Sequence, residues 1–123
     1  MPAAKNITGR QTSAGGGEET VNLSLDGSTA SATIAISTGT ILVITDWVCS
    51  AEAACRFRLQ QTNDGVTFFD LGLLRISADG TVGMVGLGTG RRIVGGQTVA
   101  IRVRDDAAAA TTLVQTTICG YTE

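Results

Sequence analysis

Apolar and polar residues alternate with a period of two over much of the chain from Thr20 onward. The alternation is clearest at residues 55–60, Cys-Arg-Phe-Arg-Leu-Gln, and at residues 99–104, Val-Ala-Ile-Arg-Val-Arg. Because successive side chains of a β-strand point to opposite faces, this pattern predicts strands with one buried and one exposed face. Residues 41–44, Ile-Leu-Val-Ile, are apolar on both faces, which predicts a strand that is covered on both sides.

Turn-forming residues separate these segments, and no segment shows the 3.6-residue period of a helix. Asp-Gly pairs and glycine clusters recur at short intervals, where tight connections need a positive φ. We expect about eight strands, lying within residues 20–25, 31–37, 40–49, 55–62, 66–71, 73–77, 80–85, 97–104 and 111–121. Short antiparallel strands without helices predict an all-β fold, an antiparallel β-sandwich of jelly-roll topology.

The N-terminal segment, residues 1–19, differs from the rest of the chain. It is small and polar in composition, includes Gly15-Gly16-Gly17, and shows no period of either kind. This composition predicts a flexible N-terminal arm over residues 1–19, followed by one sandwich domain over residues 20–123. Such an arm either frays or becomes ordered against a neighbouring subunit.

Composition and charge exclude several classes of partner. Hydrophobic residues make up 43% of the 123 residues and charged residues only 16%, a low share for the surface of a free monomer. The net charge is −2 and no basic run is long enough to follow a phosphate backbone, so nucleic-acid binding is not expected. The N-terminus lacks a signal peptide and no window reaches roughly 18 apolar residues, so we expect a protein made in a cytoplasm without membrane insertion.

The chain is poor in catalytic and metal-binding residues. Histidine is absent, and the three cysteines, Cys49, Cys55 and Cys119, lack metal-ligand spacing. A Cys49–Cys55 disulfide across a hairpin is one alternative, but the favoured interpretation is that the cysteines are small core hydrophobes. We therefore expect no cofactor, no metal site and no enzymatic activity.

Acidic residues offer two further alternatives. Asp46 and Asp70 could supply the two carboxylates of a glycosidase, but the chain has few aromatic residues to stack against sugar rings. Aspartates at predicted turns, such as Asp26 and Asp64, suit hydrogen bonds to their own backbone better than a calcium site. Residues 86–92, Gly-Leu-Gly-Thr-Gly-Arg-Arg, lack the following helix of a phosphate-binding loop and are interpreted as a flexible connection.

The most informative polar residues are four arginines that alternate with apolar residues on two strands, Arg56 and Arg58 on one and Arg102 and Arg104 on the other. This pattern predicts a stripe of positive charge on one sheet face. It is either a solvated surface or an interface where guanidinium groups pair with carboxylates such as Asp46 or Asp70 of an adjacent subunit. The interface is the favoured interpretation, because the chain is otherwise poor in charge.

Four segments resemble the small jelly-roll modules of tailed-phage virions, which occur in capsid decoration (cement) proteins and in fibre tips. They are residues 39–46 (GTILVITD), 73–81 (LLRISADGT), 96–103 (GQTVAIRV) and 118–123 (ICGYTE). The resemblance covers about two-thirds of the chain, and its motifs are structural.

The resemblance implies a homotrimer at the virion surface that binds and stabilises the outer capsid, with the major capsid protein or another virion protein as partner. The alternative is a receptor- or carbohydrate-binding tip domain of a head or tail fibre. That alternative needs exposed aromatic residues such as Trp47 or Tyr121.

Overall fold

A computed structural model describes residues 3–13, 18–77, 80–85, 91–105 and 112–123. Over these residues the chain is all-β, and every strand pairing is antiparallel. The strands are β1 (Ala3–Ser13), β2 (Glu18–Thr20), β3 (Leu23–Leu25), β4 (Ile34–Ala35), β5 (Ile41–Ala51), β6 (Cys55–Thr62), β7 (Phe68–Ile76), β8 (Gly80–Val85), β9 (Arg91–Val94), β10 (Thr98–Asp105) and β11 (Thr112–Thr122).

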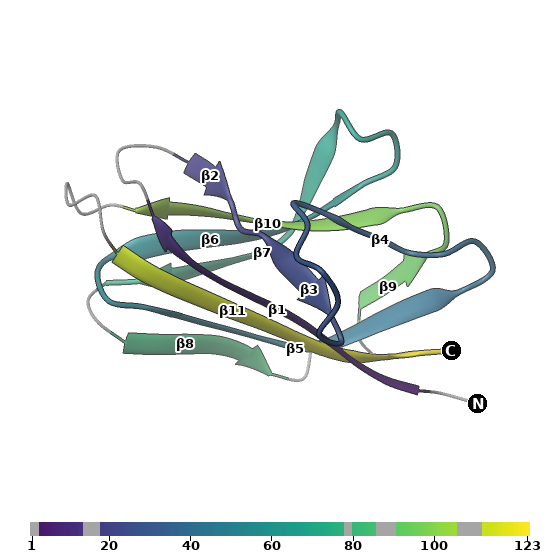
Figure 1. The fold of residues 1–123 in the computed structure, drawn as a ribbon, viewed down its shortest axis with the longest axis horizontal. Coiled ribbons are helices and arrows are strands. Elements are labelled where there is room, and N and C mark those ends of the chain that lie inside the picture. The colour runs from purple at the N-terminus through teal and green to yellow at the C-terminus, as the bar shows by residue number, and fades with distance from the viewer. Residues whose placement is uncertain (1–2, 14–17, 78–79, 86–90, 106–111) are drawn as a thin grey trace.

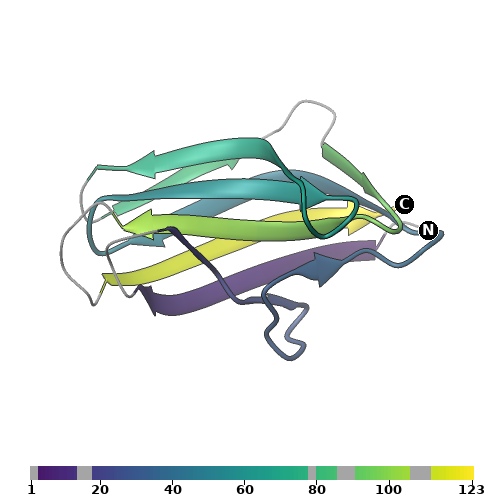
Figure 2. The ribbon, with the colours of Figure 1, turned by 90° about the horizontal axis from the view of Figure 1, so that it is seen from above.

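The strands form two layers (Figure 1). One sheet has the order β3-β1-β11-β5-β8, with β9 also paired to β5; we call it the β11 sheet. The other has the order β2-β10-β6-β7, with β4 also paired to β10; we call it the β6 sheet. Strands of both layers run along the long axis of the molecule (Figure 2), and Ala3 pairs with Thr122, so the two described ends of the chain lie together. The predicted antiparallel β-sandwich is confirmed.

The core lies between the two sheets. Its largest fully buried side chains are Trp47 from β5 and Phe57 from β6, one from each layer. In β6 and β10 the apolar residues of the predicted alternation face inward, as expected from period two. Burial of this apolar cluster is the main stabilising contribution to the fold.

Both faces of β5 are covered near its start, as the apolar run at residues 41–44 predicted. Leu42 faces the core, and Val43 on the opposite face is also buried. Val43 pairs with Arg92 of β9 on one side and with Tyr121 of β11 on the other. Arg92 donates two hydrogen bonds, of 2.7 and 2.6 Å, to the Glu123 carboxylate across β5, and this bridge helps to cover Val43.

The predicted flexible arm is wrong for residues 3–13. These residues form β1, which pairs with β11 along its whole length and with β3 on its other side. Ile7 faces the core, but the next inward position is Gly9, where a side chain would collide with Val21 and Leu23. The space that a bulky residue would fill is occupied by Val21 and Leu23, so the apolar alternation that marks a strand is missing. Residues 1–2 and 14–17 lie outside the described residues.

Other strand predictions are corrected in detail. The single strand expected at residues 20–25 is two short strands in different sheets, because the chain crosses between the layers at Val21 and Asn22. The two strands expected at 66–71 and 73–77 are one strand, β7, with a bulge at Leu71. The strand expected at 31–37 is reduced to β4.

The segment 86–92, expected to be a flexible connection, is only partly described. Residues 86–90 lie outside the described residues, and Arg91 and Arg92 begin β9. This short strand was not predicted, and it pairs with the first part of β5.

Candidate functional site

The outer face of the β6 sheet carries the predicted arginines. In β6 the inward positions hold Cys55, Phe57 and Leu59, so Arg56 and Arg58 point outward, and both are partly exposed. In β10 the inward positions hold Ile101 and Val103, which leaves Arg102 and Arg104 on the outer face. The predicted orientation of all four arginines is confirmed.

The strand register arranges these arginines in two rows. Arg104, Arg56 and Arg75 stand directly opposite one another on β10, β6 and β7, and Glu18 of β2 pairs with Arg104 at the end of this row. Arg102 and Arg58 are opposite each other in the next row, which continues to Leu73. We call the five arginines together with Leu73 the arginine face.

Sequence reasoning missed Arg75 and Leu73. The segment Leu73-Leu74-Arg75-Ile76 has inward Leu74 and Ile76, so period two would have placed Arg75 outward. The signal was obscured because Leu73 and Leu74 are both apolar, which hides the alternation at its first step. Leu73 is 54% exposed, and Arg75 is exposed beside it.

Two carboxylates of the same chain lie on this face. Glu18 is 3.5 Å from Arg58 and 3.7 Å from Arg102, and Asp70 is 3.8 Å from Arg58. Asp70 also accepts a hydrogen bond of 2.9 Å from the side-chain amide of Gln60. The structure thus brings Asp70 to the predicted arginines within one chain, whereas no described carboxylate forms an ion pair with Arg75 or Arg104.

Asp46 is not part of the arginine face of its own chain. It lies on β5 in the β11 sheet, where it accepts a hydrogen bond of 3.0 Å from the Thr45 hydroxyl. Asp46 and Asp70 therefore lie in different sheets, and this separation removes the structural basis for a two-carboxylate hydrolytic site between them.

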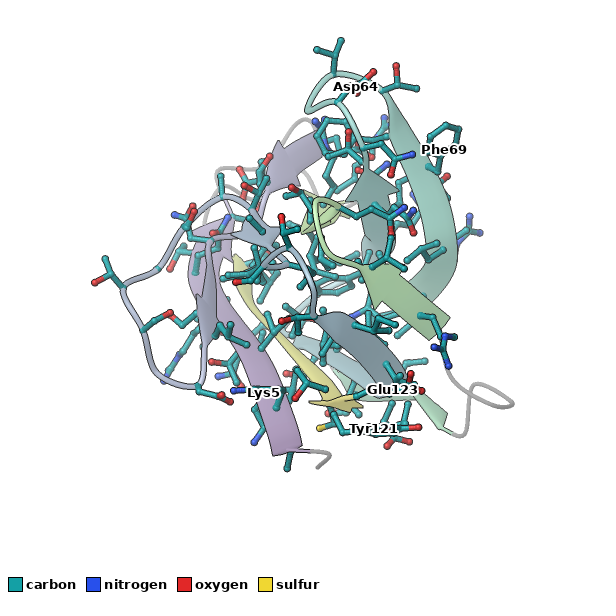
Figure 3. The ribbon with its side chains drawn as sticks, turned by 90° about the vertical axis from the view of Figure 1, so that its right-hand side faces the viewer. Lys5, Asp64, Phe69, Tyr121 and Glu123 are labelled. Carbon is teal, nitrogen blue, oxygen red and sulfur yellow. The ribbon has the colours of Figure 1, made fainter. Side chains whose placement is uncertain are left out.

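The surface between the arginines is hollowed. A depression of about 290 Å³ is lined by Glu18, Arg56, Arg58, Leu73, Arg75 and Arg104. Leu73 is the exposed apolar residue of this hollow. Phe69 is also exposed and points away from the sandwich (Figure 3), but it pairs with Gln61 and so lies on the opposite face of the β6 sheet from the arginines. The site therefore combines a cluster of guanidinium groups with one exposed apolar side chain.

The aromatic residues do not form an exposed stacking platform over the described chain. Trp47 has no exposed surface, and its indole N–H donates a 2.8 Å hydrogen bond to the Thr116 hydroxyl. The expectation that Trp47 could be an exposed carbohydrate-binding residue is wrong, because its ring fills the core. Phe68 lies on the outer face beneath Arg102, whose guanidinium carbon is 5.2 Å from the ring centroid.

The Cys49 thiol is unsuited to nucleophilic chemistry. Cys49 and Cys55 are not joined by a disulfide; both are buried, and they come from different sheets. Burial raises the pKa of Cys49 to about 12, although its contact with Thr116 at 3.4 Å acts on this pKa in the opposite direction. At neutral pH Cys49 is a neutral thiol within the core, in agreement with the favoured interpretation of this cysteine as a core residue.

Asp64 holds the backbone of its own turn, as expected, whereas Asp26 bonds to residues of β1. Asp64 accepts hydrogen bonds of 2.8 Å from both Thr67 and Val66 backbone amides, and these bonds lower the pKa of its carboxyl group. The Asn6 amide and the nearby Lys5 ammonium group lower the pKa of Asp26 in the same way. No group of three or more potential metal ligands occurs among the described residues, and the described part contains no helix long and apolar enough to cross a membrane.

Comparison with known proteins identifies the fold. No family model and no curated protein matches the chain. Among solved structures it is similar to murine APRIL, with a TM-score of 0.54, 10% identity and coverage of 94% of this chain and 98% of that one. Weaker likenesses are to Eiger TNF from S. frugiperda (TM-score 0.46, 11% identity, 92% and 90% covered) and to the Yersinia pseudotuberculosis-derived mitogen (0.38, 9%, 95% and 86%).

The likeness to APRIL shows the class of protein: this chain is a jelly-roll β-sandwich. At this level of identity the likeness concerns the fold alone, because one fold hosts many functions.

Proposed function

We propose that this chain is a non-enzymatic structural protein of a phage virion, a trimeric decoration protein that binds and stabilises the outer capsid surface. The observation that carries the proposal is the arginine face. Its guanidinium groups lie beside exposed Leu73, and arginine with apolar side chains is the composition of protein interfaces. The assignment to a virion rests on the resemblance of residues 39–123 to phage jelly-roll modules.

The fibre-tip alternative is less well supported. A carbohydrate site in a jelly roll needs exposed aromatic rings, and Trp47 is fully buried. Tyr121 is partly exposed, but it lies among the partnered residues Arg92 and Glu123 rather than in a hollow with other aromatics.

The proposal is tested by the mass of the protein and by its binding to particles. Sedimentation equilibrium at micromolar concentration should return three times the chain mass of 12.6 kDa. The purified protein should then bind capsids of the encoding phage that lack it, reach saturation, and raise the temperature at which those capsids lose their DNA. A particle with the mass of one chain would contradict the trimer, and capsids that bind no protein would contradict the decoration function.

A further inference from the structure

We propose that the arginine face binds an acidic segment of a partner protein, whose carboxylates enter the hollow between Arg56, Arg75 and Arg104. This inference rests on the proposed function, because it names the chemistry of the virion protein to which this chain attaches. Three observations carry it: the register of the arginines, the separation of charge over the described side chains, and the occupation of the other carboxylates.

The strand register places arginines opposite one another, which destabilises the β6 sheet. Like charges directly opposite each other on neighbouring strands are destabilising, and the row of Arg104, Arg56 and Arg75 contains two such pairs in succession. Threonine or glutamate in place of Arg75 would make a more favourable cross-strand pair with Arg56. A break of this local pairing rule is typical of a functional site.

Charge is separated over the described side chains. The arginine face holds five arginines, with only Glu18 and Asp70 beside them among these side chains. Over the other described side chains, carboxylates outnumber cations. The cations are Lys5, Arg10 and Arg92, and the carboxylates are Glu19, Asp26, Asp46, Glu52, Asp64 and Glu123. A positive face whose surroundings are negative orients the molecule toward an acidic surface.

A second copy of the chain fits the arginine face poorly. Its described carboxylates outside that face are dispersed and most are occupied: Asp26 pairs with Lys5 at 3.2 Å and Glu123 with Arg92 at 2.6 Å. Asp64 holds its own turn, and Glu19 accepts a hydrogen bond from Gln11. The described surface of another copy therefore offers no cluster of free carboxylates, which favours a different protein as partner.

The chemistry of the face favours carboxylates on a protein over nucleic acid. A guanidinium group presents a planar fork that matches a carboxylate in a bidentate arrangement. Leu73 occupies the end of the second arginine row and is exposed there, so a partner must also bury apolar surface.

The first test uses a short fluorescent polyglutamate peptide and measures its anisotropy at several salt concentrations. The wild-type protein should bind the peptide, and binding should weaken as salt rises. The double variant Arg75→Glu/Arg104→Glu should weaken binding by about tenfold or more, since it reverses two charges at the hollow. It should also unfold in urea at a concentration no lower than wild type, because two Arg–Arg pairs become opposite-charge pairs while only the pair with Glu18 becomes like-charged.

Arg10→Glu is the control for net charge, with half the charge change of the double variant. Arg10 is an exposed strand arginine on the β11 sheet, so its variant changes the net charge in the same direction without touching the arginine face. The inference is overturned if wild type does not bind the peptide, or if Arg10→Glu weakens binding as much as the double variant. It is also overturned if a DNA oligonucleotide of equal charge displaces the peptide more effectively than unlabelled polyglutamate does.

Capsid binding separates this inference from the proposed function. If wild type and the double variant bind capsids equally, the protein decorates capsids by another surface and the inference fails. If wild type binds polyglutamate but not capsids, the decoration function fails and the acidic-segment site stands. Loss of capsid binding by the double variant alone supports both.

Discussion

A buried hydrogen bond from Trp47 to Thr116 fixes the largest side chain of the core. Thr116 occupies an inward position of β11, and its hydroxyl accepts the indole hydrogen bond of Trp47 and contacts the Cys49 thiol. A buried indole N–H without a partner loses its hydrogen bond with water and gains nothing in return. Thr116 therefore stabilises the largest side chain of the core in one rotamer.

Replacement of Thr116 by valine tests this contribution. The variant Thr116→Val keeps the shape of the side chain but leaves the Trp47 N–H without its acceptor, so we expect the free energy of unfolding to fall by about 1–3 kcal/mol. Urea denaturation followed by Trp47 fluorescence measures the change. Thr117→Val, on the adjacent outward position of the same strand, should change it by less than about 0.5 kcal/mol. Equal losses in the two variants would show that the hydrogen bond is not the cause.

Residue positions were predictable from sequence where period two was regular. The outward placement of Arg56, Arg58, Arg102 and Arg104 followed from the apolar residues between them. Trp47 could not be placed in this way, because a strand irregularity precedes it. The charge partners could not be placed either, since Glu18 lies outside the predicted domain and reaches the arginines only through the pairing of β2 with β10.

A β-bulge in β5 is the element that sets the shape of the β11 sheet. Ile44 pairs with Gly120 and Asp46 with Cys119, so Thr45 is the additional residue. The bulge lets both Ile44 and Trp47 face the core, although their positions in the sequence differ by an odd number. At the same place the partner of β5 on its outer side changes from β9 to β8.

Gly120 is required opposite this bulge. A Cβ atom at Gly120 would collide with the backbone carbonyl of Val43, which cannot move without disturbing the paired strands. We expect Gly120→Ala to reduce the free energy of unfolding by about 3 kcal/mol or more. Gly83→Ala is the control, because the Cβ of this variant would come no closer than 3.2 Å to a neighbouring atom, and that atom belongs to the Val48 side chain. Thermal unfolding measures both, and a Gly120→Ala variant as stable as Gly83→Ala would show that β5 and β11 are not held at this separation.

Elements were predicted where long apolar runs or regular alternation occur, as in β5, β6, β10 and β11. Strands were missed where few of their inward positions hold apolar side chains. In β9, Ile93 is the core residue of a short strand that follows a glycine-rich segment. In β1, inward Gly9 makes room for neighbours from another part of the chain, and this packing is visible only in three dimensions.

At the scale of the whole molecule, the sandwich followed from the sequence and the role of its N-terminus did not. β1 lies between β3 and β11, away from the edges of its sheet, and its residue Ile7 packs into the core. The described residues of the predicted arm thus include an internal strand. Strand order depends on long-range pairing, which local patterns do not encode.

This position predicts the effect of truncation. Deletion of residues 1–19 removes β1 and most of β2, separates β3 from β11 and exposes core surface, so we expect the chain to lose cooperative unfolding and to aggregate. The substitution Ile7→Ala should produce a milder form of the same defect, costing about 2–4 kcal/mol. Circular dichroism and thermal denaturation measure both, with a chain that begins at Ala3 as the control, expected to unfold like wild type. A shortened chain that still unfolds cooperatively would mean that β1 is dispensable, and that the N-terminal segment acts as an arm after all.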